Sequence, residues 1–292
     1  MKVLLLTDIV IFLLSILGGT GSAVVSDVPQ EMVCAECHSD RLEYDVIHYP
    51  AEDACDNCHE ATGAEHPGEI KGFKLMDSTP ELCFCCHEET APNDHPHIPV
   101  VKGSCLDCHN AHGSSELVLL KSPDHELCLS CHNKSYSSDS FETVNIRRLV
   151  KGKMLPHSAI DGGGCLACHQ AHGSGLRKLL VELYPADDYL PAGTGEFGLC
   201  FLCHDTDLLE AEKTEWGTNF RNGKQNLHQL HIKGDKGRNC RMCHNLHGSE
   251  QKFLIEKQVG FGNWEMNMNF IPEEQGGSCQ PGCHGKLSYS RQ

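Results

Sequence analysis

Residues 105–132 read CLDCHNAHGSSELVLLKSPDHELCLSCH, and this stretch contains the unit from which most of the chain is built. It holds two copies of the pattern Cys-x-x-Cys-His, separated by His-Gly-Ser and a leucine-rich segment. The pattern occurs eight times in the 292 residues, and a ninth copy has one extra residue between its cysteines. We number the copies motifs 1 to 9 in chain order: Cys34/Cys37/His38, Cys55/Cys58/His59, Cys83/Cys86/His87, Cys105/Cys108/His109, Cys128/Cys131/His132, Cys165/Cys168/His169, Cys200/Cys203/His204, Cys240/Cys243/His244 and Cys279/Cys283/His284.

The repeated pattern predicts covalent attachment of haem. The two cysteines form thioether bonds to the haem, and the following histidine becomes the proximal ligand of its iron. Zinc knuckles and a disulfide scaffold are the alternatives, but neither requires a histidine directly after each pair of cysteines. With only 20 histidines in 292 residues, nine such histidines are not a coincidence, and a disulfide scaffold would leave one of the 19 cysteines over. We therefore expect nine c-type haems, bound through iron.

Two motifs depart from the common form. Motif 3 reads CFCCH and includes Cys85, which does not have the usual spacing to His87 and is expected to be a spare thiol. Motif 9 reads CQPGCH, and its turn-forming Pro281-Gly282 can accommodate the extra residue.

After motif 1, the motifs come in pairs. Pairs 4/5, 6/7 and 8/9 each begin with C-x-x-C-H-x-x-H-G-S, and pair 2/3 is a looser copy in which His66 replaces His-Gly-Ser. This arrangement resembles the doubled-CxxCH family of multihaem cytochromes, over about residues 31–285. The family includes long periplasmic cytochromes that hand electrons to an outer-membrane porin complex. The resemblance implies electron transfer in the cell envelope.

The remaining 11 histidines are candidates for the second axial position of each iron. One lies seven to nine residues before the first cysteine of each pair, and another follows the first motif of each pair. These eight are His48, His97, His157 and His231, and His66, His112, His172 and His247. His95, His125 and His228 are left for motif 1, although His95 competes with His97, and His228 with His231.

The spacing restricts which haem each histidine can reach. His112 lies three residues after His109, on nearly the same side of a helical turn, so we expect it to ligate a neighbouring haem. His97 is less restricted, since eight residues of extended chain reach about 26 Å.

Enough histidines are present for every haem to be bis-histidine. Because catalysis at haem needs an exchangeable axial position, we expect an electron carrier without a catalytic residue. A multihaem reductase with one incompletely ligated haem, at motif 1 or motif 9, is an alternative. Met76, Met154, Met266 and Met268 are expected to be packing residues.

The formal charge is concentrated in the first half. Residues 24–132 contain 21 Asp and Glu against 5 Lys and Arg, whereas residues 133–292 contain 18 of each. The carboxylates either keep the protein soluble or attract a basic redox partner, such as a basic cytochrome. Arg147, Arg148, Lys151 and Lys153 mark a different surface. Nucleic acid is not an expected partner.

Two architectures remain open for electron transfer. The difference in charge between the two halves would suit docking of different partners at the two ends. It therefore favours a periplasmic or porin-associated conduit, which we prefer. Histidines surplus to the pairs could instead ligate a haem in the next subunit of an extracellular filament, which would be a homopolymer.

The N-terminus predicts export. Lys2, an apolar run over 9–17 and small residues over 18–23 are typical of a signal peptide, residues 1–23, although Asp8 leaves an uncleaved anchor open. No later segment reaches the roughly 18 apolar residues that cross a bilayer. We expect a periplasmic or outer-membrane-associated protein, or alternatively an extracellular one.

Three parts are expected in the mature chain: an acidic module with five motifs (24–132), a linker (133–164) that includes the Ser-rich stretch 135–140, and a module with four motifs (165–292). About 30 residues for each haem, and only 6% aromatic residues, leave little material for an ordinary core. The predicted fold is mostly irregular, with short α-helices and little β-structure, in an extended chain wrapped around a closely packed haem array.

Overall fold

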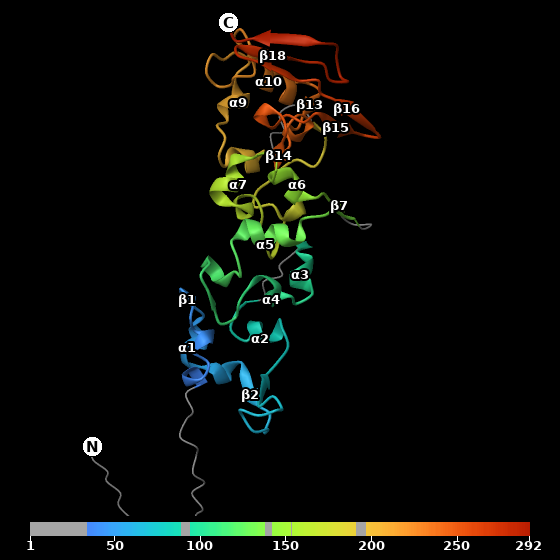
Figure 1. Ribbon diagram of the computed structural model, residues 1–292. Coiled ribbons are helices and arrows are strands. Elements are labelled where there is room, and N and C mark those ends of the chain that lie inside the picture. Colours follow the sequence, from blue (N-terminus) through green and yellow to red (C-terminus); the bar gives the residue numbers. More distant parts are fainter. Residues whose placement is uncertain (1–33, 89–93, 138–141, 153, 191–196) are drawn as a thin grey trace, which may run out of the picture.

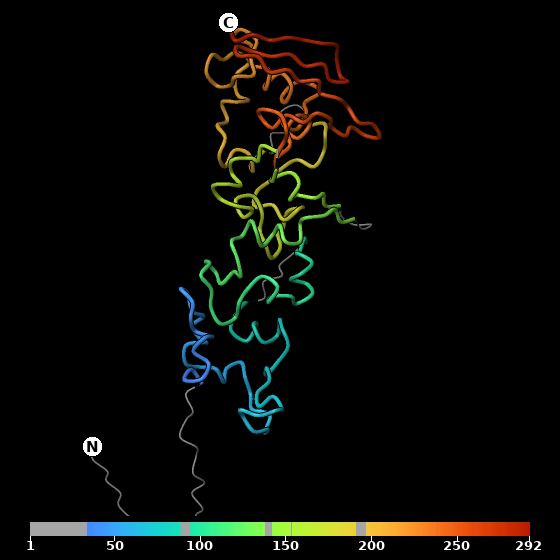
Figure 2. The backbone as a smooth tube through the Cα atoms, viewed as in Figure 1, coloured from blue at the N-terminus to red at the C-terminus, as the bar shows by residue number. Residues whose placement is uncertain are grey.

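The computed structural model describes residues 34–88, 94–137, 142–152, 154–190 and 197–292. The predicted signal peptide, residues 138–140 of the Ser-rich stretch and Lys153 lie outside these ranges. The described chain forms a long, narrow molecule whose blue-to-red order follows its long axis (Figures 1 and 2). Segments that are far apart in the sequence meet where successive repeats adjoin and near the C-terminus, where Gly223 is hydrogen-bonded to Ser290.

Helices in the described ranges are short, and the longest, α5, has eight residues. The α-helices are α1 (Tyr49–Asp53), α2 (Glu81–Phe84), α3 (Ile98–Val101), α4 (Cys105–Cys108), α5 (Asp124–Cys131), α6 (Ile146–Val150), α7 (Ser158–Gly163), α8 (Gly198–Phe201), α9 (Asp207–Glu210) and α10 (Leu227–Ile232). The 3-10 helices are η1 (Cys34–Glu36), η2 (Ser39–Arg41), η3 (Cys55–Asn57), η4 (Leu117–Leu119), η5 (Cys165–Ala167), η6 (Arg177–Leu179), η7 (Cys240–Met242) and η8 (Lys252–Leu254). Of the helices that can be described, none has the length and apolar character needed to cross a membrane.

The helical turns lie mainly on the motifs. In motif 4, the backbone N–H of His109 donates to the carbonyl of Cys105 at 3.0 Å, and six other motifs close the same turn between their histidine and first cysteine. Helices this short are marginal on their own in water. They must therefore be stabilised by what packs against them.

Strands have two to four residues each. They are β1 (Val46–Ile47), β2 (His59–Ala61), β3 (Phe73–Leu75), β4 (His95–Pro96), β5 (Gly113–Ser114), β6 (Tyr136–Ser137), β7 (Glu142–Thr143), β8 (Leu155–Pro156), β9 (Gly173–Ser174), β10 (Tyr189–Leu190), β11 (Arg221–Asn222), β12 (Gln225–Asn226), β13 (Gly237–Arg238), β14 (Gly248–Ser249), β15 (Gln258–Phe261), β16 (Trp264–Asn267), β17 (Ile271–Glu273), β18 (Gly276–Cys279) and β19 (Leu287–Ser290). They form two-stranded pairs and one three-stranded sheet, β17-β18-β19. The prediction of an irregular, extended chain with short helices and little sheet is confirmed.

Three antiparallel strand pairs join successive repeats, and we call them the strand latches. They are β1 with β5, β4 with β9, and β8 with β14. In each latch, the strand just before the upstream histidine of one pair meets the Gly-Ser of the next pair, as Leu155 meets Ser249. The N–H of the upstream histidine donates to the carbonyl of the histidine in His-Gly-Ser, as His157 does to His247 at 2.9 Å.

The latches formed by β5 and β14 need glycine in the Gly-Ser strand because the backbone of the partner segment lies too close for a side chain. A Cβ on Gly113 would lie 2.8 Å from the carbonyl oxygen of Val46. A Cβ on Gly248 would lie 2.9 Å from the carbonyl oxygen of Leu155 and still closer to that of Leu149. Because these neighbours are backbone atoms, they cannot move aside as a flexible side chain could.

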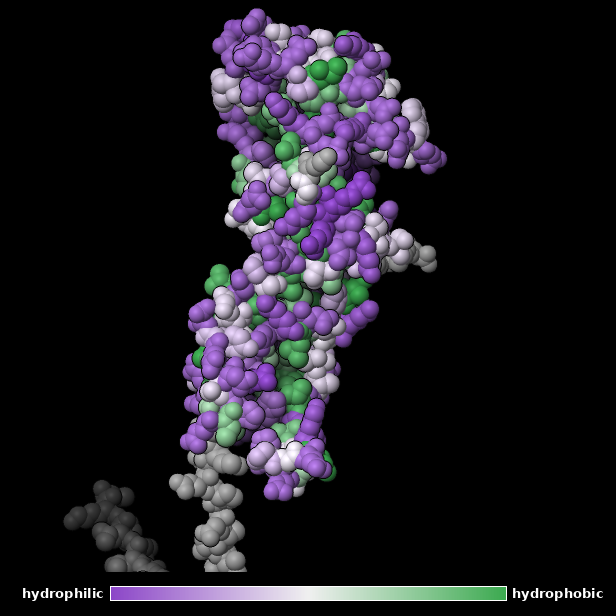
Figure 3. All heavy atoms as spheres, viewed as in Figure 1, coloured by the Kyte–Doolittle hydropathy of each residue, from purple (hydrophilic) through white to green (hydrophobic). Residues whose placement is uncertain are grey.

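The protein core is small. The buried apolar side chains among the described residues are Leu129, Leu190, Phe197, Leu209, Met242, Met266 and Met268. Six of the seven form two clusters, Leu190 with Phe197 and Leu209, and the three methionines with one another. On the face drawn in Figure 3, apolar side chains lie in small groups among hydrophilic ones. The chain alone therefore has little interior of its own, in agreement with the composition.

Candidate haem-binding centres

Each of the nine motif histidines faces a second histidine from another segment of the chain. The distances between ring centroids are 5.9 Å for His38–His66, 6.2 Å for His59–His112, 6.0 Å for His87–His48, 5.9 Å for His109–His172, 6.3 Å for His132–His97, 6.2 Å for His169–His247, 6.1 Å for His204–His157, 6.4 Å for His244–His228 and 6.5 Å for His284–His231. Eighteen of the 20 histidines are thus arranged in nine pairs.

These separations fit two axial ligands of one iron. Because a metal–imidazole bond is about 2 Å and the ring centroid lies about 1 Å behind the bonding nitrogen, two imidazoles on opposite sides of one iron have centroids about 6 Å apart. Across the part of the chain that the structure describes, no three His, Cys, Asp or Glu side chains converge as a metal site. A facing pair of imidazoles is the donor set that axial ligation of haem iron uses.

The histidine pairs follow a rule. Each upstream histidine faces the second motif of its own pair, as His97 faces His132. Each histidine that follows a first motif faces the first motif of the preceding pair, as His172 faces His109. In pairs 4/5, 6/7 and 8/9, each repeat therefore places one histidine opposite the preceding repeat, beside a strand latch.

Both ends of the chain complete this rule in their own way. Motif 1 has no partner motif, and the histidine opposite His38 is His66 of pair 2/3. In pair 8/9, His228 on α10 lies opposite His244. His231, three residues further along the same helix, lies opposite His284.

The candidates left open by the sequence are thereby separated. His228 and His231 do not compete, because they face different motifs. His66 takes the place opposite motif 1, for which the sequence left His95, His125 and His228 as candidates. His95 in β4 and His125 occur in no ring pair of the described residues, and His125 instead lies 3.7 Å from the carboxylate of Asp124.

The cysteines of consecutive motifs lie close together, so the motifs follow one another in sequence order. The thiols stand where thioether sulfurs would be when haem is attached. First cysteines of successive motifs lie close together at four junctions: Cys34 with Cys55, Cys83 with Cys105, Cys128 with Cys165, and Cys200 with Cys240. Second cysteines adjoin at the alternate junctions, as where burial and then the nearby Cys203 raise the pKa of Cys168.

Not all attachment cysteines are enclosed by protein. Twelve of the 18 are half-buried, and six are exposed, namely Cys34, Cys37, Cys86, Cys131, Cys203 and Cys283. Binding residues are commonly buried, and these six depart from that pattern because the chain has so small a core. A thiol that is to carry haem must face the macrocycle and not the protein interior, so exposure to solvent is compatible with attachment. The assignment of all 18 cysteines to haem stays a prediction.

The backbone nevertheless holds the exposed second cysteines in ordered turns. The N–H of Cys37 donates to the carbonyl of Cys34 at 3.2 Å, and the N–H of Cys86 donates to that of Cys83 at the same distance. Cys86 also lies close enough to Cys58 to raise the pKa of that thiol, after the larger effect of burial. Exposure of these side chains therefore does not mean that their loops are irregular.

Contacts with nearby residues order the two unusual motifs, 3 and 9. In motif 9, the Cys283 thiol lies 3.5 Å from Sδ of Met266, and the N–H of His284 donates to the carbonyl of Pro281 at 3.4 Å. The extra residue is thus contained in the turn at Pro281. In motif 3, the thiol of Cys85 donates to the carbonyl of Glu81 at 3.5 Å, as a cysteine outside the attachment pattern can do.

Hydrogen bonds define the tautomer of several paired histidines. The Nδ1 atoms of His48 and His97 each lie 2.9 Å from a carbonyl oxygen, of Ala111 and Ala171. Because a carbonyl only accepts, Nδ1 carries the hydrogen and Nε2 keeps its lone pair for a metal. Burial lowers the pKa of His228 and of His247 to about 4, which keeps both imidazoles in the neutral form that ligation requires.

The comparisons with known proteins agree with this geometry. The profile of the doubled CXXCH motif matches residues 48–92, 97–136 and 157–208, and each matched segment begins at an upstream histidine. Each of the three segments carries the doubled CXXCH motif of that family. The multiheme cytochrome MtrA of Shewanella baltica (strain OS185) is 32% identical over 119 residues, which is 38% of this chain. This doubled-CXXCH protein spans about a third of the length of that curated relative, 34%. It is a multihaem c-type cytochrome.

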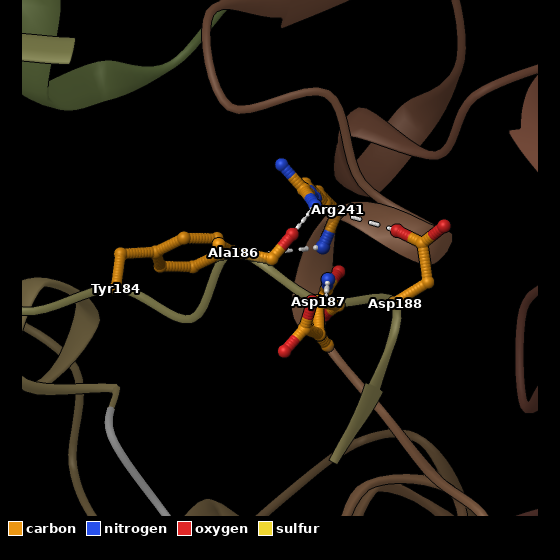
Figure 4. Close-up of polar contacts among 6 residues, drawn as sticks. Tyr184, Ala186, Asp187, Asp188 and Arg241 are labelled. Carbon is orange, nitrogen blue, oxygen red and sulfur yellow. Dashed lines mark hydrogen bonds and ion pairs between the residues drawn. The ribbon is translucent and has the colours of Figure 1, made fainter. Parts of the chain in front are cut away.

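One support of the doubled-CXXCH array had no signal in the sequence. In motif 8, the backbone N–H of Arg241 donates to the hydroxyl of Tyr184 at 3.1 Å, and the guanidinium contacts the carbonyl of Ala186 and the carboxylate of Asp188, the latter at 3.4 Å (Figure 4). The segment after motif 6 therefore holds the attachment loop of motif 8. Burial raises the pKa of Tyr184 above its ordinary value, so the phenol stays protonated.

Proposed function

We propose that this cytochrome carries nine bis-histidine haems and conducts electrons through the cell envelope. The observation that carries the proposal is that all nine motif histidines face a second histidine of the same chain. Haem bound at these sites would supply reversible one-electron oxidation and reduction. The cysteines of each motif would attach it, and the paired histidines would hold its two axial positions.

The order of the motifs supports conduction from end to end. The cysteines of successive motifs adjoin at every junction, so the file runs in sequence order without branching. The ligand exchange between repeats holds neighbouring motifs in place. Motif 1 and motif 9 lie at opposite ends of the long axis (Figure 1).

A conduit is favoured over a filament because both ends depart from the repeat. Pair 2/3 lacks the His-Gly-Ser strand that would accept a latch from a preceding repeat. In pair 8/9, His231 lies on α10, and His228 supplies the ligand that a following repeat would have supplied. No motif therefore needs a histidine from a second copy.

We propose that the two modules, 24–132 and 165–292, work as one unit across the 133–164 linker. The pair His109–His172 and the latch between β4 and β9 both span this boundary. Asp124 adds a further link, because its carboxylate accepts the backbone N–H of Cys165 at 3.0 Å.

For partners, we propose a basic redox protein at the end that holds motif 1. Residues 34–88 contain 13 Asp and Glu against 3 Lys and Arg, and two of these cations pair with neighbouring carboxylates, Arg41 with Asp40 and Lys74 with Glu60. Such a surface speeds the approach of a basic partner. At the other end we propose an outer-membrane porin–cytochrome complex, on the resemblance to long periplasmic cytochromes.

Two measurements on the purified protein test the ligation. Mass spectrometry is expected to find nine haems, and electron paramagnetic resonance of the oxidised protein is expected to find only low-spin ferric iron. A high-spin signal equal to one haem per chain would contradict complete bis-histidine ligation and would favour a reductase. Fewer than nine haems would contradict the attachment assignment.

The architecture and the partner are tested separately. Electron microscopy without added partners is expected to show single particles, whereas filaments would contradict the conduit. The rate of reduction by a basic cytochrome is expected to fall as salt rises, since salt screens the attraction. A rate that does not depend on salt would contradict docking at the acidic end.

A further inference from the structure

The proximal histidines of motifs 4, 6 and 8 share a feature that the ligand pairing does not explain. Their Nδ1 atoms lie 2.9 Å from the carbonyl oxygen of Val118, 2.9 Å from that of Lys178 and 2.7 Å from that of Phe253. In each case the accepting residue is nine positions after the histidine, in η4, η6 or η8. The same hydrogen bond, from Nδ1 of a proximal histidine to a carbonyl nine residues later, therefore occurs in three motifs.

An unusual backbone presents each of these carbonyls. Val118 and Leu119 have φ values of 50° and 58°, and the equivalent residues of the other two loops have φ values between 57° and 61°. Two consecutive residues with side chains in the left-handed region are rare, because the Cβ atom is crowded there. The loop therefore needs external restraint to keep this conformation.

A buried serine supplies that restraint in motif 4. Ser114, the serine of His-Gly-Ser, is 5% exposed. Its hydroxyl donates to the carbonyl of Leu120 and accepts the backbone N–H of Glu116 at 2.9 Å. The serine thus contacts the loop on both sides of the left-handed residues.

The other two loops have the same arrangement. Ser174 is 2% exposed and Ser249 is 1% exposed. Their hydroxyls donate to carbonyls at 2.6 and 2.5 Å and accept N–H groups at 2.9 and 3.1 Å, the partners being Leu180 and Leu176 for Ser174, and Ile255 and Gln251 for Ser249.

We propose that Ser114, Ser174 and Ser249 are positioning residues that set the redox potential of three haems in the array. Each serine holds a left-handed carbonyl on Nδ1 of a proximal histidine. A hydrogen bond from Nδ1–H makes the imidazole a stronger donor to iron, which stabilises the ferric state and lowers the potential. The inference rests on the haem attachment proposed above.

Motif 2 provides the contrast within the same chain. Its histidine, His59, begins β2, which pairs with β3 in a hairpin instead of leading into a left-handed loop. Pair 2/3 also lacks the His-Gly-Ser element. The serine-held carbonyl therefore belongs to alternate motifs from motif 4 onward.

The test is a triple variant, Ser114→Ala with Ser174→Ala and Ser249→Ala, studied by optical redox titration. Three of nine haems, one third of the amplitude, are expected to move to more positive potential while all remain low-spin. Ser115→Ala is the matched control, because Ser115 is the exposed neighbour of Ser114. Its titration is expected to superpose on that of the unaltered protein.

Several results would overturn the proposal. A triple variant with nine low-spin haems and an unchanged titration would remove any role of the serines in setting potential. If the triple variant does not mature, each single variant is expected to shift one ninth of the amplitude. Failure of all three single variants to mature would assign the serines to folding instead. Fewer than nine haems in the unaltered protein would count against the haem assignment, and not against the serines.

Discussion

The imidazole rings of His169 and His247 are nearly parallel, with an interplanar angle of 3° and centroids 6.2 Å apart. The two residues belong to different repeats, and the latch between β8 and β14 lies directly beside them. The backbone pairing of the next repeat therefore places His247 opposite the histidine of motif 6. This relationship allows ligation and chain packing to be tested separately.

Replacing His247 by alanine is expected to leave the iron at motif 6 with one protein ligand. The His247→Ala variant should then show a high-spin ferric signal equivalent to one haem in nine by electron paramagnetic resonance. His125→Ala is the control, since His125 lies beside Asp124 and faces no motif histidine among the described residues. A wholly low-spin His247→Ala protein, or a high-spin His125→Ala protein, would refute the assigned ligands.

Replacing the latch glycine Gly248 by alanine is also expected to raise the high-spin signal, although Gly248 is not itself a ligand. In Gly248→Ala, the new Cβ would collide with backbone carbonyls, at a cost of about 1–3 kcal/mol. We expect β14 to separate from β8 and His247 to move, which would raise the high-spin fraction. Gly175→Ala adds the same methyl group where no atom lies within 4 Å, and its spectrum should not change. Equal spectra for the two variants would mean that the latch does not position the ligand.

Asp124 is expected to hold the junction between motifs 5 and 6. Asp124→Ala removes the acceptor of the Cys165 N–H, and leaving such a group unpaired costs about 1–2 kcal/mol. Amide hydrogen exchange at Cys165 should therefore become about tenfold faster, since opening needs less free energy. Asp161→Ala, at an exposed carboxylate, serves as the comparison. Unchanged exchange at Cys165 would show that the bond contributes nothing.

Tyr184 is expected to stabilise the attachment loop of motif 8 through its hydroxyl alone. Tyr184→Phe keeps the ring but removes the acceptor of the Arg241 N–H, so exchange of that amide should speed up by about five- to tenfold. The matched change is Tyr189→Phe, because Tyr189 is 46% exposed and its ring packs on Phe261 and Arg238. Similar exchange in both variants would contradict the anchoring role.

Much of this arrangement could be predicted because it depends on the spacing of cysteines and histidines that are close in the sequence. The nine motifs, the irregular fold and the expectation that His112 serves a neighbour all follow from short-range patterns. The direction of ligand exchange could not be predicted, because flexible chain allows His66 or His97 to reach several irons. His228 was ambiguous for the same reason, since it lies three residues from His231 and the spacing does not say which motif each faces. The left-handed residues Val118 and Leu119 carry no sequence signal, because propensity disfavours them there.

The latches and ligand pairs also impose an order in time. A chain that leaves the ribosome and crosses a membrane from its N-terminus presents His59 well before His112, and His109 well before His172. If haem is attached in chain order, motif 2 and motif 4 would hold it without their facing histidines until the next repeat arrives. Maturation would then proceed repeat by repeat, and an arrest of translation after any repeat would leave its first motif without the facing histidine.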